Sequence, residues 1–439
     1  MRILDVPEAK RTILKRVAAS DVTLAASVQT RLNEVMGCEI SADEAVKRII
    51  SDVRRDGDAA LRRYCEAFDE APHPAFEVPR EEIDRALTAI PAQLRDALEF
   101  AAGRVGAYHE EQRRRLVNSY SHDGLGVTVR PIETVGFYVP GTWRVYPSSV
   151  LHTLIPAGVA GVPNLIMVSP ADGTGRVPDV KLAAAAIAGA SRVFMASGAQ
   201  AIAALAYGTA SIPRVDKVCG PGNIFVTLAK RAVYGDVGID SMYGPTETVV
   251  VADDEADPVL CAVDLIAQAE HDEIATPILI CTSRAMAEKV AGEVERRLAD
   301  LPTRPVVSAA FENRGGGVVA SSIEEAVELA SEFAPEHLCL LARDARRLAP
   351  LIKNAGGIFI SDNSPEAIGD YTAGPSHVMP TGGAARFASP LTVLDFLKLT
   401  TIVDLNDRDV LDVGPPGAVI ARAEGLYGHA RAIEERLPK

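Results

Sequence analysis

The 439-residue sequence predicts an α/β protein in which helices cover both faces of parallel sheets. The main observation is an alternation of short apolar runs with helix-length stretches from about Val127 onward, which is typical of parallel strands joined by helices. The composition agrees, because 48% hydrophobic and 24% charged residues are ordinary for a globular protein. The length corresponds to roughly three domains.

The N-terminal third is predicted to be helical. The stretch from Ser41 to Glu44 has the pattern of a capping box, and apolar residues follow it at helical spacing. Another helix is expected to begin after Pro79. Helical periodicity then continues to about Arg115, with Pro91 as a break or kink.

The expected strands are short apolar runs in the remaining two thirds of the chain. They are Val135–Val139, Leu165–Val168, Val193–Ala196, Val215–Val218, Thr248–Ala252, Ile278–Cys281, Val318–Ala320, Leu338–Leu341 and Ile358–Ile360. From Gly414 onward the chain leaves this alternation and becomes an isolated helical tail. Such a tail packs either on its own subunit or on a neighbouring one.

Charge and cysteine usage narrow the class of protein. The formal charge is −14, which argues against nucleic acid or an anionic membrane as a partner. The six cysteines form no CxxC pair, so they are expected to be buried thiols in a reducing compartment. There is no apolar signal region and no run long enough to span a bilayer, which favours a cytoplasmic protein.

The eight histidines divide into two groups. His73, His109 and His122 lie in polar contexts and are expected at the surface. Most of the others have neighbours that suggest chemistry. At the end of one helical pattern, Gln268 and His271 are three residues apart and share a face, which is half of a metal site or else a polar helix end.

Two further segments carry acid/base or ligand side chains. Glu336 and His337 stand together before an apolar run, as general acid/base catalysis would need, although an ordinary loop ion pair fits equally well. The loop from Ser364 to His377 contains Asp370 and follows a buried strand pattern, where α/β proteins place ligands.

The C-terminal helical pattern contains Glu424 and His429, which converge only if Gly425 or Gly428 bends the helix. The alternative is a frayed terminal helix. Taken together, a Gln, an Asp and two or three His residues suggest a zinc, manganese or cobalt ion with nitrogen and oxygen ligands.

Glycine-rich turns point to a phosphate-bearing ligand. Turns containing Gly141, Gly198 and Gly220 each follow an expected strand, and the last two open helical patterns. Such units direct backbone N–H groups and the positive end of a helix toward an anion. Although βα turns often need glycine, three in one half of the chain favour a dinucleotide or another phosphate ligand.

These motifs resemble the histidinol dehydrogenase family over nearly the whole chain. The matching segments are Gly136–Gly141, Pro147–Val150, Gly198–Leu205, Gly220–Asn223, Gly244–Glu247, Gln268–His271, Pro335–Leu338, Gly369–Tyr371, His377, Pro380–Ala384, Glu424–Leu426 and His429. The resemblance implies a homodimer of α/β subunits with two related Rossmann-like domains, one inserted in the other, a helical N-terminal segment and a C-terminal tail exchanged between subunits.

The resemblance also implies domain limits and the roles of individual residues. The expected limits are a helical segment 1–34, a main α/β domain 35–136 and 248–391 with the metal and catalytic residues, an inserted NAD-contacting domain 137–247, and a tail 392–439.

The implied zinc ligands, one ion per subunit, are Gln268, His271, Asp370 and His429, the last supplied by the partner chain. The implied catalytic pair is Glu336 and His337, and the implied NAD contacts are Tyr138, Gln200 and Asn223. The implied substrate contacts are Thr246, Gln268, His271, His337, Asp370, His377, Glu424 and His429.

The family oxidises L-histidinol to L-histidine in two NAD-dependent steps, so the resemblance implies this activity. Some positions depart from the family's pattern. Thr246 stands where Ser is frequent, His152 stands where an apolar residue is common, and Thr142-Trp143-Arg144 replaces small residues. A cation such as Arg144 would suit an anionic substrate, so another small polar alcohol such as a sulfopropanediol is the alternative. A non-catalytic ligand-binding paralogue is a second alternative.

Overall fold

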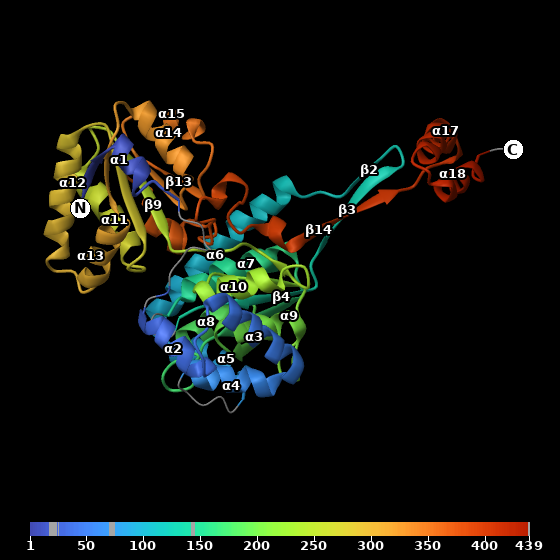
Figure 1. Cartoon of the computed structure of the whole chain (residues 1–439), viewed down its shortest axis with the longest axis horizontal. Coiled ribbons are helices and arrows are strands. Elements are labelled where there is room, and N and C mark those ends of the chain that lie inside the picture. Colours follow the sequence, from blue (N-terminus) through green and yellow to red (C-terminus); the bar gives the residue numbers. More distant parts are fainter. Residues whose placement is uncertain (17–23, 25, 70–74, 142–144, 438–439) are drawn as a thin grey trace.

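The computed structural model describes residues 1–16, 24, 26–69, 75–141 and 145–437. The described chain forms two compact units, each built around a parallel sheet, and a long antiparallel ribbon of three strands that leads to a pair of helices (Figure 1). His73 and the segment Thr142-Trp143-Arg144 lie outside the described residues. The interpretation that Arg144 would suit an anionic substrate therefore concerns a residue that the structure does not describe.

The first unit is built on a six-stranded sheet in the order β1-β11-β10-β9-β12-β13, with every pair parallel. Its strands are β1 (Ile3–Asp5), β9 (Glu247–Ala252), β10 (Thr276–Cys281), β11 (Gly316–Val319), β12 (His337–Leu341) and β13 (Gly357–Ile360). The helices are α1 (Val6–Arg11), α11 (Pro258–Ala269), α12 (Arg284–Leu298), α13 (Arg304–Asn313), α14 (Ile323–Phe333) and α15 (Ala345–Leu348). They form two separate apolar clusters, one on each face of the sheet.

The second unit is built on a five-stranded parallel sheet in the order β6-β5-β4-β7-β8. Its strands are β4 (Thr134–Tyr138), β5 (Asn164–Ser169), β6 (Arg192–Met195), β7 (Lys217–Cys219) and β8 (Gly238–Ile239). The connecting helices are α7 (Pro147–Ala160), α8 (Asp179–Ile187), α9 (Gly198–Tyr207) and α10 (Ile224–Val233).

The two sheets share one topology. Numbered along the chain, the five strands of the second sheet run 3-2-1-4-5, and β9 to β13 of the first sheet repeat that order with β1 added at the edge. This order matches the first five strands of the 3-2-1-4-5-6 order of a Rossmann fold. The predicted fold class and all the predicted apolar runs are therefore confirmed as strands.

The helices of the N-terminal third pack against the second sheet. They are α2 (Ala26–Met36), α3 (Ala42–Asp56), α4 (Asp58–Asp69), α5 (Arg80–Ala89) and α6 (Ala92–Leu116). Their apolar side chains join the two cores of the five-stranded unit. The prediction that residues 35–136 share a domain with 248–391 is therefore wrong for these helices, and the N-terminal segment itself begins with a strand, β1, of the other sheet.

Local signals for these helices are confirmed. Ser41 and Glu44 form a capping box at the start of α3. Pro79 and Pro91 stand directly before α5 and α6, because proline fits the start of a helix and not its interior. His109 is buried in α6, so its predicted exposure is wrong. Five of the six thiols are buried as expected, whereas Cys38 is exposed.

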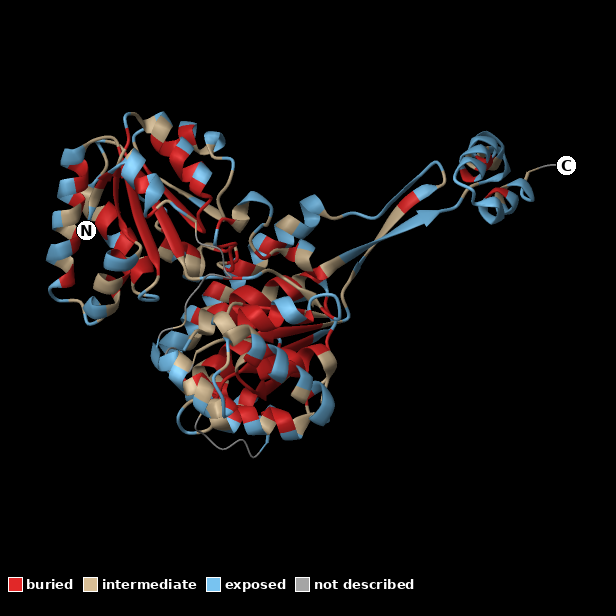
Figure 2. Ribbon diagram, in the orientation of Figure 1, coloured by how far each residue is buried: buried red, intermediate tan, exposed pale blue. Residues whose placement is uncertain are grey.

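An antiparallel ribbon extends away from both units. It consists of β2 (Tyr120–His122), β3 (Leu125–Pro131) and β14 (Leu397–Val403), and it leads to α17 (Asp407–Ala423) and α18 (Tyr427–Glu434). Figure 2 shows buried sheets in the two units but a largely exposed ribbon and helical pair. The isolated tail predicted from the sequence is therefore confirmed, and the ribbon that carries it is new.

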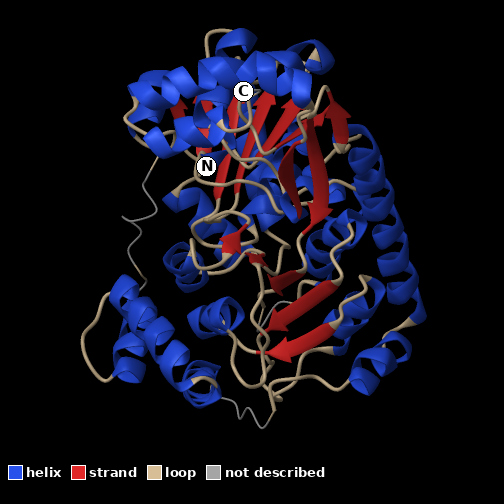
Figure 3. Ribbon diagram, turned by 90° about the vertical axis from the view of Figure 1, so that its right-hand side faces the viewer, coloured by secondary structure: helices blue, strands red, loops and turns tan. Residues whose placement is uncertain are grey.

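The remaining views agree with a layered α/β architecture. In Figure 3, strands of the sheets lie among helices on their two faces. Within the described part of the chain, no helix combines the length and the apolar character needed to cross a bilayer.

Candidate active site

The predicted catalytic and ligand residues meet at the amino ends of β9 and β12. Thr246 directly precedes β9, while His337 is the first residue of β12 and Glu336 stands just before it. β9 and β12 are neighbours in the sheet, so these side chains lie side by side. Gln268 reaches the same place from the end of α11.

Asp370 reaches the cluster by a reversal of the chain after β13. A short helix, α16 (Glu366–Ile368), and a π-helical turn, Gly369–Ala373, follow that strand and lead back toward the start of β12. The side chain of Asp370 then lies with Oδ1 3.5 Å from Nε2 of His337. Loops after parallel strands more often hold ligands at the carboxyl edge. Here the loop after β13 delivers its carboxylate to the amino edge.

A continuous chain of polar contacts joins these residues. Thr246 Oγ1 lies 2.7 Å from Glu336 Oε2 and 2.9 Å from Gln268 Oε1. Gln268 Nε2 in turn donates to Asp370 Oδ2 at 3.5 Å. One hydroxyl hydrogen cannot serve two oxygens. The Thr246 hydroxyl therefore donates to one of these two oxygens at a time, and Glu336 Oε2 also accepts from the Glu247 N–H at 3.1 Å.

The ring of His337 is held in one orientation. Its Nδ1 lies 3.2 Å from the carbonyl oxygen of Glu247, and the ring stacks on Phe359 with centroids 5.8 Å apart. In the neutral ring, an Nδ1–H donated to that carbonyl would leave the lone pair on Nε2. Nε2 is buried and faces Asp370, with Oδ1 at 3.5 Å, so it is the ring atom that points into the cluster.

Burial and charge shift the pKa values of this group strongly. Burial raises the pKa of Glu336 to about 7 and that of Glu366 to about 8. Burial opposes the charge of His337, but Glu336 and Asp370 outweigh it and raise the His337 pKa to about 10. Burial likewise opposes the charge of Asp370, and His337 outweighs it and lowers the Asp370 pKa to about 2.

The sequence analysis did not select Glu366. Its carboxyl is fully buried, accepts a hydrogen bond from Thr248 Oγ1 at 2.8 Å, and leaves Oε1 without a partner among the described residues. The one sequence feature that could have indicated Glu366 is that the loop after β13 contains a second carboxylate besides Asp370. Its burial, however, depends on the return of that loop onto the sheet.

The cluster suits a divalent cation but does not complete its coordination within one chain. Gln268 and Asp370 are in contact, and the charge of His271 acts on the pKa of Asp370. The carboxylate of Asp370, whose pKa is lowered, and the amide oxygen of Gln268 are oxygen donors of the kind that a divalent cation takes. No group of three His, Cys, Asp or Glu side chains in the described ranges is placed to hold a metal.

His377 lies beside this cluster and supports it. Its Nδ1 is 2.8 Å from the backbone oxygen of Asp370, and its Nε2 is 3.1 Å from Ser149 Oγ. The ring also stacks on His152, with centroids 4.3 Å apart and planes 5° apart. Burial lowers the pKa of both imidazoles, so the stacked pair is neutral near pH 7.

Glu424 and His429 are not brought to the cluster by their own chain. Both side chains are exposed in the helical tail, which Figure 1 places at the far end of the ribbon. Gly425, with a φ of +77°, ends α17, so the two residues lie on separate helices. The chain therefore breaks at Gly425, one of the two glycines at which a bend was considered.

The predicted NAD residues lie at the carboxyl edge of the five-stranded sheet. Tyr138 ends β4, and its hydroxyl accepts a hydrogen bond from the Gly198 N–H at 3.2 Å. Gln200 is buried in α9 and donates to Ser197 Oγ at 3.1 Å. Asn223 caps α10 and is exposed. These side chains therefore shape the βα turns that surround the point between β4 and β7, where the strand order reverses.

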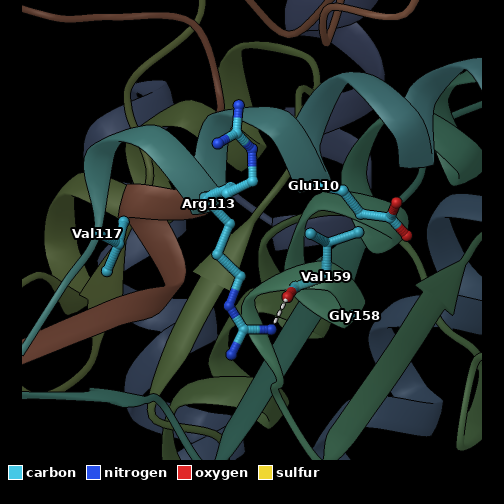
Figure 4. A pocket seen from close by; sticks show the side chains of 6 residues that line it. Glu110, Arg113, Val117, Gly158 and Val159 are labelled. Carbon is cyan, nitrogen blue, oxygen red and sulfur yellow. Dashed lines mark hydrogen bonds between the residues drawn. The ribbon is translucent and has the colours of Figure 1, made fainter.

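A surface groove elsewhere does not coincide with this site. It lies between α6 and α7, has a volume of about 480 Å³, and contains a hydrogen bond from Arg113 to the Val159 carbonyl (Figure 4). It is lined by Glu110, Arg113, Arg114, Val117, Gly158 and Val159. None of the predicted site residues lines it.

Comparisons with known proteins identify the family of the chain. The family model for histidinol dehydrogenase matches residues 36–437. A histidinol dehydrogenase from Deinococcus radiodurans is 46% identical over the full length of both chains, and one from Thermus thermophilus is 47% identical over 90% of this chain and 95% of its own. A crystal structure of histidinol dehydrogenase from Elizabethkingia anophelis superposes with a TM-score of 0.89 at 30% identity, covering 99% of this chain and 98% of the other. The chain therefore belongs to the histidinol dehydrogenase family, whose members are NAD-dependent oxidoreductases acting on CH–OH groups.

Proposed function

We propose that the protein oxidises L-histidinol to L-histidine, through an aldehyde, in two NAD-linked steps of histidine biosynthesis. One observation supports this more than any other. Gln268, Glu336, His337 and Asp370 are far apart in the sequence, yet they form a single connected and largely buried cluster. That cluster combines a proton-holding pair with the oxygen donors of a metal site.

Gln268, His271 and Asp370 would hold one zinc ion, with His429 of a second copy of the chain as the fourth ligand. The donor set of nitrogen and oxygen without thiolate is compatible with zinc. When bound, the ion would orient the substrate and offset negative charge at the site. A cation beside Asp370 would also weaken the field of that carboxylate on His337, which lowers the His337 pKa toward neutrality.

His337 is the residue suited to remove the proton of the substrate hydroxyl. Its Nε2 faces Asp370 in the cluster, while Glu247 and Phe359 hold the ring in place. Glu336 is suited to the second step, because a carboxyl with a pKa near 7 can take a proton from a water that attacks the aldehyde. Thr246, Glu424 and His377 complete the substrate contacts, with Glu424 again supplied by the second copy.

The dinucleotide would bind at the carboxyl edge of the five-stranded sheet, next to Tyr138, Gln200 and Asn223. Ligands of open α/β sheets bind where the strand order reverses, and here that point lies between β4 and β7. NAD supplies the hydride acceptor for both oxidations. The role of these residues is to shape the turns that receive it.

A homodimer with exchanged tails accounts for the isolated helical pair. The only buried core of α17 and α18 consists of Ala418, Ala421 and Ala430 among the described residues. Such a core is far too small to hold two helices on its own. Leu399 of the ribbon and Val419 of α17 are 72% and 69% exposed. Exposed apolar side chains on an extended arm favour docking on a second subunit.

The test is the formation of NADH by the zinc-loaded enzyme with L-histidinol and with a panel of amino alcohols and diols, including a sulfopropanediol. We expect two NADH for each L-histidinol oxidised, with L-histidine as the product. Turnover of another alcohol but not of L-histidinol would contradict the substrate. Loss of all turnover together with retained zinc binding would indicate a non-catalytic paralogue.

A further inference from the structure

Two lysines are buried within the five-stranded unit, and they differ in how their charge is balanced. Lys230 of α10 forms an ion pair with Asp240, and both side chains are 1% exposed. Lys181 of α8 is 0% exposed, and the hydrogen-bond acceptors of its ammonium among the described residues are neutral oxygens. Its ammonium is therefore a buried positive charge without a contacting negative partner.

The contacts of Lys181 place its ammonium directly behind the turn that follows β4. Nζ donates to the carbonyl oxygens of Pro140 at 2.8 Å and Gly141 at 2.9 Å, and to Ser169 Oγ at 2.8 Å. Pro140 and Gly141 follow β4, and Ser169 ends β5. The lysine thus ties together the carboxyl ends of two adjacent strands at the edge where the dinucleotide is proposed to bind.

This arrangement is unfavourable for the free protein. A buried ammonium costs free energy even when neutral oxygens accept all its hydrogen bonds. Burial accordingly lowers the pKa of Lys181 to about 8, and Asp172 opposes this only through its more distant charge. An anion bound on the outer side of the turn would provide the missing negative charge.

Lys181 also shapes the turn itself. Because it draws two consecutive carbonyl oxygens inward, the dipoles of those peptide groups have their negative ends away from the outer side of the turn. Lys230 acts in the same way on the turn after β7, where its Nζ donates to the Gly220 carbonyl at 2.9 Å. There, however, Asp240 cancels its charge. The two turns flank the point where the strand order reverses, and only the turn after β4 keeps a net positive charge behind it.

We propose that Lys181 is a positioning and charge-supplying residue for the diphosphate of the dinucleotide, acting from behind the Pro140–Gly141 turn. Its three hydrogen bonds stay with the protein, and its charge stabilises the diphosphate across the turn. This rests on the proposed NAD site and adds a residue to it. Two unit charges about 12 Å apart, at an effective dielectric constant of about 20, interact strongly enough to change an affinity by about tenfold.

The experiment compares Lys181→Met with the unmodified full-length protein. Methionine keeps much of the buried stem and removes the charge. Dissociation constants are measured by calorimetry for NAD⁺, ADP and adenosine. We expect about tenfold weaker binding of NAD⁺ and ADP, adenosine affinity within about twofold, and kcat at saturating NAD⁺ within about twofold.

A matched control is Lys217→Met, which removes a lysine charge from the opposite, amino edge of the same sheet. Lys217 Nζ donates to the Asp395 carbonyl at 2.6 Å, next to β7 and away from the turns. We expect its ADP affinity to equal that of the unmodified protein.

Unchanged ADP affinity in Lys181→Met would overturn the proposal. So would an equal loss of ADP and adenosine affinity, because a collapsed turn weakens both. If the Met variant does not fold, Lys181→Gln is measured in the same way, since glutamine can still donate to carbonyls. Failure of both variants to fold would make Lys181 a folding residue and overturn the proposal. An unmodified protein that binds neither NAD⁺ nor ADP would instead contradict the proposed function.

Discussion

Residue type and pairing were enough to predict the centre of the candidate site. Glu336 beside His337, and Gln268 three residues before His271, are pairs whose chemistry is evident from their order in the chain. Glu366 was missed because its importance lies in complete burial, which depends on how the loop after β13 returns. His109 was misjudged for the same reason, since charged neighbours along a helix do not reveal which face is covered.

Glu336→Gln is expected to lower kcat for L-histidinol by about 10² to 10⁴-fold, the usual contribution of a general acid or base. Glutamine can keep the contact with Thr246, which lies 2.7 Å from Glu336, but it cannot take up a proton. The measurement is steady-state NADH formation, with NAD⁺ affinity as the check on folding. The exposed Glu332→Gln serves as control, and activity of Glu336→Gln within a few-fold of the control would exclude the proton role.

Asp264→Asn tests the electrostatic cost of the buried carboxyls near the site. Burial raises the pKa of Asp264 from 3.8 to about 6, so the folded protein keeps a proton that the unfolded chain releases in this range. The free energy of unfolding therefore falls as pH rises from about 4 to about 6, by about 3 kcal/mol for this group. The Asn variant lacks this loss and is expected to be more stable at pH 7 but not at pH 4.

Denaturant midpoints measured from pH 4 to pH 7.5 would check this expectation. The exposed Asp300→Asn changes the same formal charge and is expected to follow the wild-type profile. Parallel profiles for Asp264→Asn and the wild type would show that Asp264 does not titrate as a buried group.

At the scale of elements, periodicity predicted what is regular and buried. The strands β4 to β7 and β9 to β12 are nearly all apolar and buried, and β13 is apolar although only partly buried, so their runs were visible in the sequence. β1 has three residues, and β3 and β14 form an exposed ribbon with no apolar face packed on a core. An edge strand and a ribbon of this kind are stabilised mainly by pairing with strands far away in the sequence. The local pattern of residues carries no information about those partners.

Gly374→Ala tests the element that positions Asp370. Gly374 follows the π-helical turn with a φ of +126°, and an added Cβ would lie 3.0 Å from the Arg104 carbonyl oxygen. The methyl group is expected to push the turn away from α6 and displace Asp370. Zinc affinity, measured by competition with a chelator, should fall by about tenfold, as for other changes behind a metal ligand.

The control for this variant is Gly292→Ala in α12, where a Cβ would meet nothing within 4 Å. It is expected to retain zinc affinity. ADP affinity should be unchanged in both variants, because the proposed dinucleotide site lies on the other sheet. Unaltered zinc affinity in Gly374→Ala would mean that the turn does not hold Asp370 in a ligand position.

At the scale of the whole molecule, chain order is a poor guide to which core a helix joins. The helices α2 to α6 lie between β1 of the six-stranded sheet and β4 of the five-stranded sheet in the sequence, and only packing assigns them to the five-stranded one. The tail illustrates the same limit. Its helices were predicted, but the ribbon that carries His429 away from Gln268 and Asp370 follows from pairing between β3 and β14, which lie far apart in the chain.

Mixing two inactive variants tests whether subunits share their sites. His429→Asn and His271→Asn should each be inactive alone, because every site lacks one zinc ligand. In an exchanged dimer of one chain of each kind, one site receives His271 and His429 from different chains and is intact, while the other lacks both. Random reassociation gives half mixed dimers, so about a quarter of the wild-type activity should return after the two variants are unfolded together and refolded. If each tail served its own chain, every site in the mixture would still lack a ligand and no activity would return.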